Sequence, residues 1–315
     1  MTYRIFCPVP RWPLGRGMQL VGGVEITELP ANIKNEFKRW KSELTGNQIK
    51  ALEATEFWFL RQFEDERILL EINTETHYRS VLSAMYAFQL IAPIGAPNFV
   101  IFSGREQNRL AIDSMRVFPA LSSTRWAGAC GFQGATRSEF VVLADGVNTA
   151  LNGSTVRLKN ALFLLEHGMR ASAPYLPLLF WTTGLDALMM AINSDTFQQR
   201  LSNFLGANRL VLPAISTIGQ PKCRVHEVLG DLFELRSIIA HGRRVEDKFL
   251  ERCGLRMLDD RPREIQEVDS CRYSQVLEEC ALFLLCRTLR RIFGEHLAET
   301  VGNEKQWKAI LNSAS

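Results

Sequence analysis

The sequence lacks the features that mark secreted and metal-binding proteins. Its N-terminal residues contain no apolar stretch of the kind found in a signal peptide. The seven cysteines are scattered along 315 residues, without a C-x2-C pair or any spacing typical of metal ligands. These absences predict a cytoplasmic protein with reduced thiols, no bound metal and no cofactor.

An excess of basic charge is also missing. Lys and Arg number 16 against 15 Asp and Glu in residues 1–150, and 21 against 19 in residues 151–315. This even distribution excludes a polybasic nucleic-acid-binding arm, so any RNA contact must come from a local patch. The Walker A, G-x-S-x-G, H-E-x-x-H and G-x-G-x-x-G signatures are absent as well.

One apolar segment, residues 173–192, has about the length of a membrane span. Two prolines at its start, the Thr-Thr-Gly sequence at 182–184 and Asp186 near its end interrupt its apolar character. We therefore expect a buried central helix of a bundle and no membrane partner.

Residues 1–145 are predicted to form a mixed α/β domain. Helical spacing of apolar residues is found in Gln48–Glu64 and Glu75–Ile91. Gly and Pro separate the strand-like segments, which are Tyr3–Cys7, Met18–Leu29, Arg67–Ile72, Phe99–Phe102, Leu110–Phe118 and Phe140–Leu143.

The pattern changes to helices alone in residues 146–315, which gives an α+β chain with an all-α second domain. An exposed connection is expected at Asp247–Asp269, which is charged and contains Pro262. The predicted helices are Ser154–His167, Tyr175–Asn193, Thr196–Leu205, Cys223–His241, Ser270–Phe293 and Glu304–Leu311.

The most informative segment is Leu232–Gly242, where an Arg and a His occur in an apolar helical run. Arg236 falls within the apolar stripe of this helix, whereas His241 lies about 140° away around the helix axis. Gly242 is well suited to end the helix. One straight helix cannot bring both side chains to a small ligand, so either its end bends or a second copy of the chain supplies the partner.

The Arg236–His241 spacing is similar to the R-x4-6-H signature of HEPN domains. An apolar helix with an acidic residue, Asp186, lies about fifty residues earlier, and an Arg-containing helix at 157–165 precedes it. Together these segments resemble the Apea-like HEPN group over roughly residues 154–295. Two positions depart from the usual family residues, because Ser237 replaces Asn, Asp or His and Asp186 replaces Glu.

The resemblance implies a helical bundle that cleaves RNA without a metal. Arg236 and His241 would be catalytic, and the cleft would form between the two protomers of a homodimer. His suits proton transfer near neutral pH, and the planar Arg fork suits a phosphate. We expect Asp186 to pair with Arg236, because a buried charge without a partner costs several kcal/mol.

Four further residues are candidates for supporting roles. Ser237 and Glu234 are expected to lie near the cleft, and Arg243 and Arg244 are candidates for RNA binding. For each there is a purely structural alternative; Arg243 and Arg244, for example, also complement the dipole at a helix C-terminus. Asp186 with Arg236 could equally serve only to fix the register of two helices.

The leading hypothesis is a cytoplasmic, homodimeric endoribonuclease, with residues 1–145 sensing a protein or small-molecule trigger. The resemblance associates such proteins with toxins and phage defence, in which tRNA or mRNA is cleaved. The alternative is a non-catalytic HEPN module that binds RNA or a nucleotide, or dimerises. A third interpretation places the main activity in residues 1–145.

Overall fold

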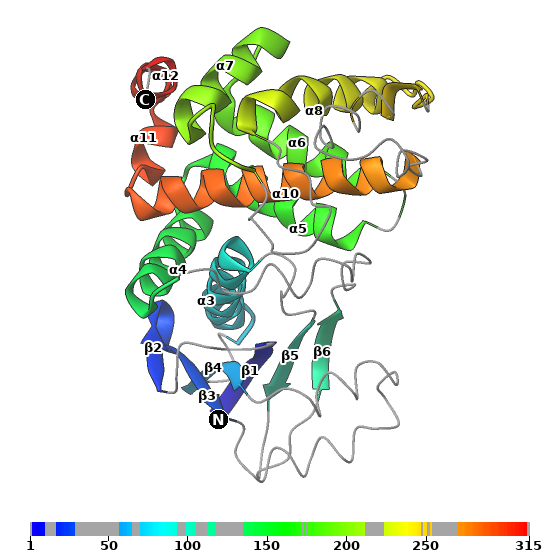
Figure 1. Ribbon diagram of the computed structural model, residues 1–315. Helices are drawn as coiled ribbons and strands as arrows, with labels where there is room; N and C mark the ends of the chain where they lie inside the picture. Colours follow the sequence, from blue (N-terminus) through cyan, green and yellow to red (C-terminus); the bar gives the residue numbers. More distant parts are fainter. Residues whose placement is uncertain are drawn as a thin grey trace. The chain divides into compact units, whose positions relative to one another are not determined.

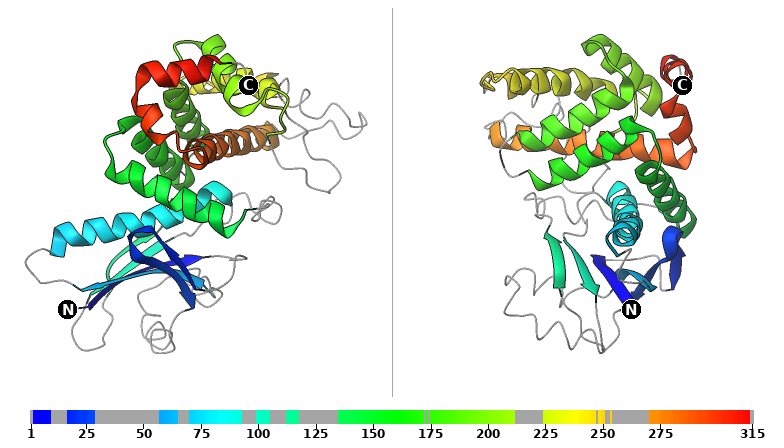
Figure 2. Two further views of the ribbon diagram at one scale, coloured as in Figure 1. Left: turned by 90° about the vertical axis from the view of Figure 1, so that its left-hand side faces the viewer. Right: turned by 180° about the vertical axis from the view of Figure 1, so that it is seen from behind.

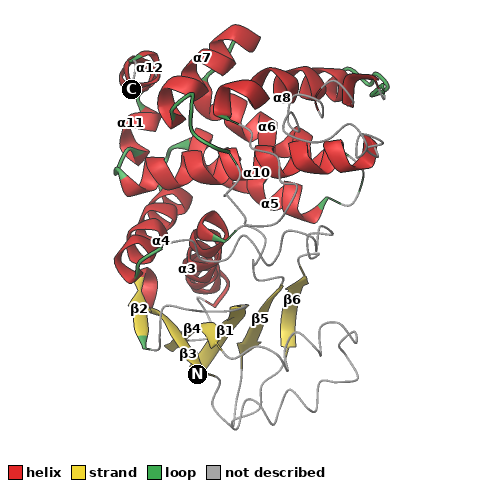
Figure 3. Ribbon diagram, viewed as in Figure 1, coloured by secondary structure: helices red, strands yellow, loops and turns green. Residues whose placement is uncertain are grey.

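The computed structural model shows an α+β fold: a sheet covered by helices comes first and is followed by helices alone (Figures 1 and 3). Two compact units divide the chain, and the change from the first to the second falls between Asn152 and Gly153. The structure describes residues 2–9, 17–28, 57–64, 70–92, 99–104, 112–117, 135–171, 173, 175–211, 224–246, 248–250, 253 and 270–313.

The first unit contains a six-stranded sheet in which every neighbouring pair is antiparallel. The strand order is β2-β3-β4-β1-β5-β6, with β4 and β1 at the centre. The strands are β1 (Thr2–Val9), β2 (Met18–Leu20), β3 (Val24–Glu28), β4 (Phe57–Glu64), β5 (Phe99–Gly104) and β6 (Ile112–Val117). The predictions of β1, β5 and β6 are confirmed.

A tight hairpin replaces the single strand predicted for Met18–Leu29. Strands β2 and β3 pair antiparallel through a one-turn 3-10 helix, η1 (Val21–Gly23). Gly22 and Gly23 have φ values of 67° and 66°, a conformation that glycine adopts without a steric cost. A Cβ on Gly22 would also meet Ser80 Oγ at 2.3 Å. The two glycines therefore reverse the chain and allow it to approach the neighbouring helix.

Two helices, α3 (Leu70–Ile91) and α4 (Arg137–Asn152), pack on the sheet and on each other. Figure 2 shows α3 lying across the strands. The ring of Phe59 on β4 lies 6.4 Å from Phe88 of α3 and 6.0 Å from Phe140 of α4, measured between centroids. These aromatic contacts form the centre of the first core.

Three predictions in this unit are wrong for the residues described. Phe57–Glu64 form strand β4 instead of a helix, because consecutive aromatic residues there are buried on both faces of a central strand. Phe140–Leu143 belong to α4, where Thr136 Oγ1 accepts from Glu139 N and caps the first turn. Leu70–Ile72 begin α3, whereas residues 48–56 and 67–69 lie outside the described residues.

The second unit is helical throughout its described residues. Its helices agree closely with those predicted, except that α11 was not foreseen. They are α5 (Val156–Arg170), α6 (Leu176–Met189), α7 (Ser194–Leu205), α8 (Val225–Ala240), α10 (Ser270–Gly294), α11 (Ala298–Gly302) and α12 (Glu304–Asn312).

Helix α6 is the centre of this unit and packs against α5, α7, α8 and α10. The Trp181 indole of α6 donates to Leu165 O of α5, and Gly168 leaves room for it, since a Cβ there would meet the indole nitrogen at 2.2 Å. At its other end, Trp307 of α12 donates to Leu188 O at 2.6 Å. The apolar segment around 173–192 is therefore largely a core helix, as predicted.

Arginines satisfy the carbonyl groups at several helix ends. The Arg200 guanidinium donates to Met189 O and Met190 O at the end of α6. Arg291 donates to Phe204 O near the end of α7, and its charge lies 4.6 Å from the centre of the Phe204 ring. Carbonyls in the last turn have no partner within the helix, so these contacts join helix ends to their neighbours.

The connection predicted at Asp247–Asp269 is not wholly exposed. Phe249, Leu250 and Cys253 are buried, and the remaining described residue, Lys248, is exposed. The high charge of this segment concealed the apolar residues Phe249 and Leu250, which stand next to each other and together cover apolar surface.

The pKa of one carboxyl group of the bundle lies close to neutral pH. Glu278 of α10 accepts a hydrogen bond from the backbone N–H of Tyr175, which precedes α6 and has a left-handed φ of 62°. Burial raises the pKa of Glu278 to about 7, and the hydrogen bond offsets part of this effect. The folded protein therefore holds this proton more tightly than the unfolded chain does.

Glu278→Gln is expected to stabilise the protein more at pH 8 than at pH 5. Because the pKa of Glu278 is higher in the folded protein than in the unfolded chain, its contribution to the free energy of unfolding depends on pH. The contribution is fully present below the unfolded pKa of 4.5 and is lost as pH rises through the folded pKa of about 7. Gln keeps the acceptor oxygen without the buried charge, so the gain at pH 8 should be about 1–3 kcal/mol. Urea unfolding at both pH values tests this, with the exposed Glu299→Gln as control. An equal effect at both pH values would contradict the assignment.

Candidate functional site

The predicted ion pair between α6 and α8 is present. Arg236 Nη2 lies 2.7 Å from Asp186 Oδ2, and the two side chains are only 25% and 18% exposed. The Arg236 guanidinium also lies 5.3 Å from the centre of the Phe233 ring, which in turn contacts Phe197 of α7. Arg236 is therefore held by a carboxylate on one neighbouring helix and by an aromatic ring one turn earlier on its own.

The surroundings of this pair act on the Asp186 carboxyl in two opposite ways. Burial raises its pKa above the ordinary value, and the charge of Arg236 lowers it and so offsets part of that rise. Asp186 Oδ1 and Arg236 Nε have no hydrogen-bond partner among the described residues. Their contact is a single, not a bidentate, bond, which leaves part of the donor capacity of Arg236 unused.

Helix α8 ends as the sequence predicts, at Gly242. The backbone N–H of Gly242 donates to Ile239 O and that of Arg243 donates to Ile238 O. Gly242 has φ 63°, so this is a Schellman ending with glycine in the left-handed position. His241 is the last residue before the reversal, and its side chain stands at the rim of the helix end.

Arg236 and His241 are not brought together within the chain. The Arg236 guanidinium faces α6, whereas His241 is exposed and its ring has no hydrogen-bond or ion-pair partner among the described residues. Helix α8 is regular through Ala240, so the separation of about 140° remains. The bend that could have joined the two side chains is absent from this helix.

The exposed face of α8 that carries His241 borders a cavity of about 410 Å³, called here the α8-end pocket. Glu234 and Ser237 line it, and both lie within about 40° of His241 around the helix. Arg243 and Arg244, the predicted RNA-binding residues, also line it. Four of the predicted site residues therefore line one cavity.

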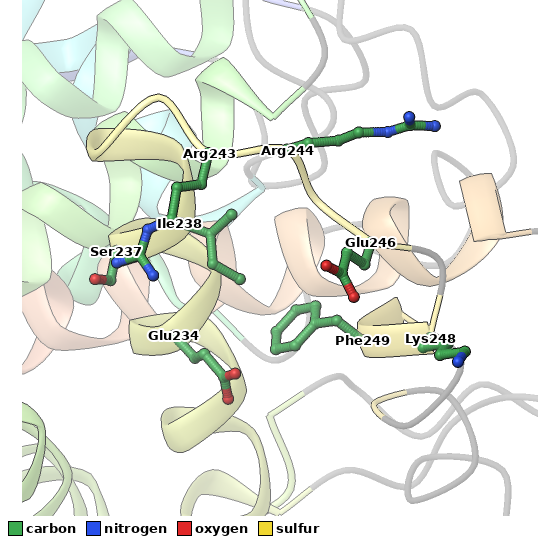
Figure 4. A pocket seen from close by; sticks show the side chains of 8 residues that line it. All are labelled: Glu234, Ser237, Ile238, Arg243, Arg244, Glu246, Lys248 and Phe249. Atoms are coloured by element: carbon green, nitrogen blue, oxygen red, sulfur yellow. The ribbon is translucent and has the colours of Figure 1, made fainter.

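The α8-end pocket combines apolar and charged groups. Ile238, Glu246 and Phe249 point towards one another across it, and Arg243 extends beside Ser237 (Figure 4). Arg244 points away from this centre. Glu246 and Lys248 make no ion pair with any described residue, and the same is true of Arg243 and Arg244. These charges are available to a ligand.

A second cavity of about 440 Å³ lies between α7 and α8. It shares Glu234 and Ser237 with the α8-end pocket and reaches Ser194, Gln198 and Asp231. Asp231 is 2% exposed and interacts with other residues of the chain. The two cavities place a run of polar side chains along one face of α8.

Sequence reasoning missed Asp231, Glu246, Lys248 and Phe249. Asp231 could have been noticed because it is a charged residue between the apolar residues Leu229 and Leu232 of α8. The other three follow the helix, and their position depends on how the chain returns after Gly242. Nothing in their spacing indicates that return.

No group of three or more metal-ligating side chains occurs among the described residues. Within the same part of the chain, no single helix is long and apolar enough to cross a membrane, although α6 and α7 pass this test as a pair bent by 78°.

No protein-family model matches the chain, and no curated protein or solved structure is significantly similar to it. The resemblance to HEPN domains expected from the sequence therefore remains a prediction, based chiefly on Arg236, His241 and Asp186.

Removing one partner of the ion pair should destabilise the fold. We expect Asp186→Ala to cost about 1–3 kcal/mol, less than for a fully buried pair because both side chains remain partly exposed. A double-mutant cycle with Arg236→Ala, measured by urea unfolding, should show a coupling of about 1 kcal/mol or more. The exposed Glu304–Lys308 pair, with N–O 2.6 Å, is the matched control and should couple much more weakly. Additive effects at Asp186 and Arg236 would refute the role given to the pair.

Proposed function

We propose that this protein is a metal-independent endoribonuclease of HEPN type. The observation that carries the proposal is the opposite placement of the two signature residues. Arg236 is fixed by Asp186, whereas His241 is exposed at a helix end beside the cations Arg243 and Arg244. Phosphodiester cleavage by a 2′-hydroxyl needs proton transfer and stabilisation of phosphate charge, which an accessible imidazole and a fixed guanidinium can supply.

In this reaction His241 removes the proton from the ribose 2′-OH as its oxygen attacks the adjacent phosphorus. Arg236 stabilises the additional negative charge on the phosphate oxygens. The P–O5′ bond then breaks, and the leaving oxygen takes a proton from the His241 imidazolium or from water. The products are a 2′,3′-cyclic phosphate and a 5′-hydroxyl, with no change in oxidation state.

The geometry of α8 favours a site shared between two protomers. Since one chain turns Arg236 and His241 in different directions, a two-fold axis close to α8 would place the His of one protomer opposite the Arg of the other. Half-buried Ile239 would contribute apolar surface to that contact. A stable interface of this kind buries at least about 1,000 Å² in total.

The wider context follows from the same resemblance. We place the enzyme in the cytoplasm, with tRNA or mRNA as substrate and a role as a toxin or in defence against phage. Residues 1–145 would receive a protein or small-molecule trigger. The antiparallel sheet and its two helices offer a separate unit for this purpose.

One observation favours the alternative of a non-catalytic module that binds RNA or a nucleotide. Within a single chain Arg236 has its carboxylate partner and makes no described contact with His241. A protein that only binds RNA would need the exposed cations and not the pair. Cleavage assays distinguish the two functions.

The purified protein should cleave RNA in the presence of EDTA, and His241→Ala should abolish this activity. Loss of a general base lowers the rate by about 100- to 10,000-fold. The thermal midpoint should hardly change, because His241 is exposed at a helix end where water replaces it. Arg236→Ala should remove cleavage and also lower the midpoint.

His226→Ala is the matched control, since His226 is another exposed histidine of α8 whose Nδ1 lies 2.8 Å from Ala207 O. This variant should retain cleavage. If His241→Ala keeps nearly normal cleavage in a preparation free of contaminating nuclease, the catalytic proposal fails and the binding module takes its place.

A further inference from the structure

The α8-end pocket contains three kinds of surface that one ligand would have to match. Ile238 and Phe249 provide an apolar wall, and the Glu246 carboxylate faces them (Figure 4). Arg243 stands beside Ser237 at one edge of the pocket. A simple anion would contact only the arginines of the pocket. A purely apolar ligand would offer the Glu246 carboxylate no hydrogen-bond donor.

We propose that the α8-end pocket binds a guanosine phosphate unit of the RNA strand. The inference deepens the proposed ribonuclease function by naming the nucleotide that is recognised. The guanine ring lies against Ile238 and Phe249, and its adjacent N1–H and N2–H groups donate to the two oxygens of Glu246. Arg243 binds the phosphate of the same nucleotide.

Guanine is favoured over the other bases by the donors it offers. Two parallel N–H groups on one edge match the two acceptor oxygens of a carboxylate, whereas adenine and cytosine offer one amino group each and uracil a single ring N–H. Glu246 is exposed and forms no ion pair with a described residue, so its oxygens are available for such a bond. Its carboxylate repels phosphate, which is consistent with placing the phosphate at Arg243 instead.

The volume and position of the pocket suit this ligand. A cavity of about 410 Å³ falls in the range usual for small-molecule sites. Glu234 and Ser237, which line it, share the face of α8 that carries His241. A nucleotide held there brings the neighbouring phosphodiester of the strand towards His241, so cleavage next to guanosine follows.

The test uses the full-length His241→Ala protein, so that binding is measured without cleavage. Four uridine-rich oligoribonucleotides of equal length, with G, A, C or U at the central position, are titrated by fluorescence anisotropy. The strand with G should bind about tenfold more tightly than the other three. GMP and AMP are titrated in parallel, because a free nucleotide carries the same chemistry as a nucleotide of the strand.

Two variants separate base recognition from phosphate binding. Glu246→Gln should abolish the preference for G without weakening binding of the strand with U at its centre, which should bind as before or slightly more tightly because a charge that repels phosphate is removed. Arg243→Gln should weaken binding of all four strands by a similar factor and keep the preference. Glu299→Gln, an exposed carboxylate on α11, is the control and should behave as the parent protein does.

Equal affinity for the four strands and for the two nucleotides overturns the proposal, as does a preference for G that survives Glu246→Gln. A preference for GMP without one for the G-containing strand overturns the assignment to RNA and gives the pocket to a free nucleotide. Because the protein carries His241→Ala, guanosine binding can be found even where the cleavage proposal fails. If the wild-type protein cleaves RNA without any base preference, the ribonuclease proposal stands, but the α8-end pocket does not recognise the substrate base.

Discussion

The ion pair between Asp186 and Arg236 is the constraint on which the arrangement of the second unit depends. Each charge lies among apolar residues of its helix and is mostly buried, so loss of either partner would destabilise the other. The pair fixes α8 against α6, the helix on which α5, α7 and α10 also pack. Around it, arginines such as Arg200 tie helix ends to their neighbours, so charged groups as well as apolar contacts determine the packing.

The ion pair turns the Arg236 side chain towards α6, and this affects the rest of the candidate site. The opposite face of α8, which carries Glu234 and Ser237, borders two cavities lined by polar and apolar residues. The Schellman ending at Gly242 then turns the chain back so that Arg243 stands beside the same face. Arg236 and His241 therefore lie on different sides of one helix, and a site that used both side chains would need a second copy of the chain.

The helices of the second unit could be predicted from the sequence, because their apolar residues recur with helical spacing and Gly242 indicates where α8 ends. The sequence was also sufficient for the pairing of Asp186 with Arg236, since buried charges need partners. It misled at Phe57–Glu64, where a central strand buried on both faces has no alternation to distinguish it from a helix. The α8-end pocket could not be predicted, because Glu246 and Phe249 reach it through a chain reversal that no local pattern specifies.

The shared site is the central claim, and a mixed dimer tests it most directly. Arg236→Ala and His241→Ala chains carrying different tags are produced together, and the heterodimer is isolated by both tags. If each site takes Arg236 from one protomer and His241 from the other, one site of the two remains intact. The heterodimer should then cleave RNA at about half the rate of the wild-type dimer, although each variant alone is inactive. A heterodimer as inactive as its parents, or a protein that stays monomeric at micromolar concentration, would contradict the account.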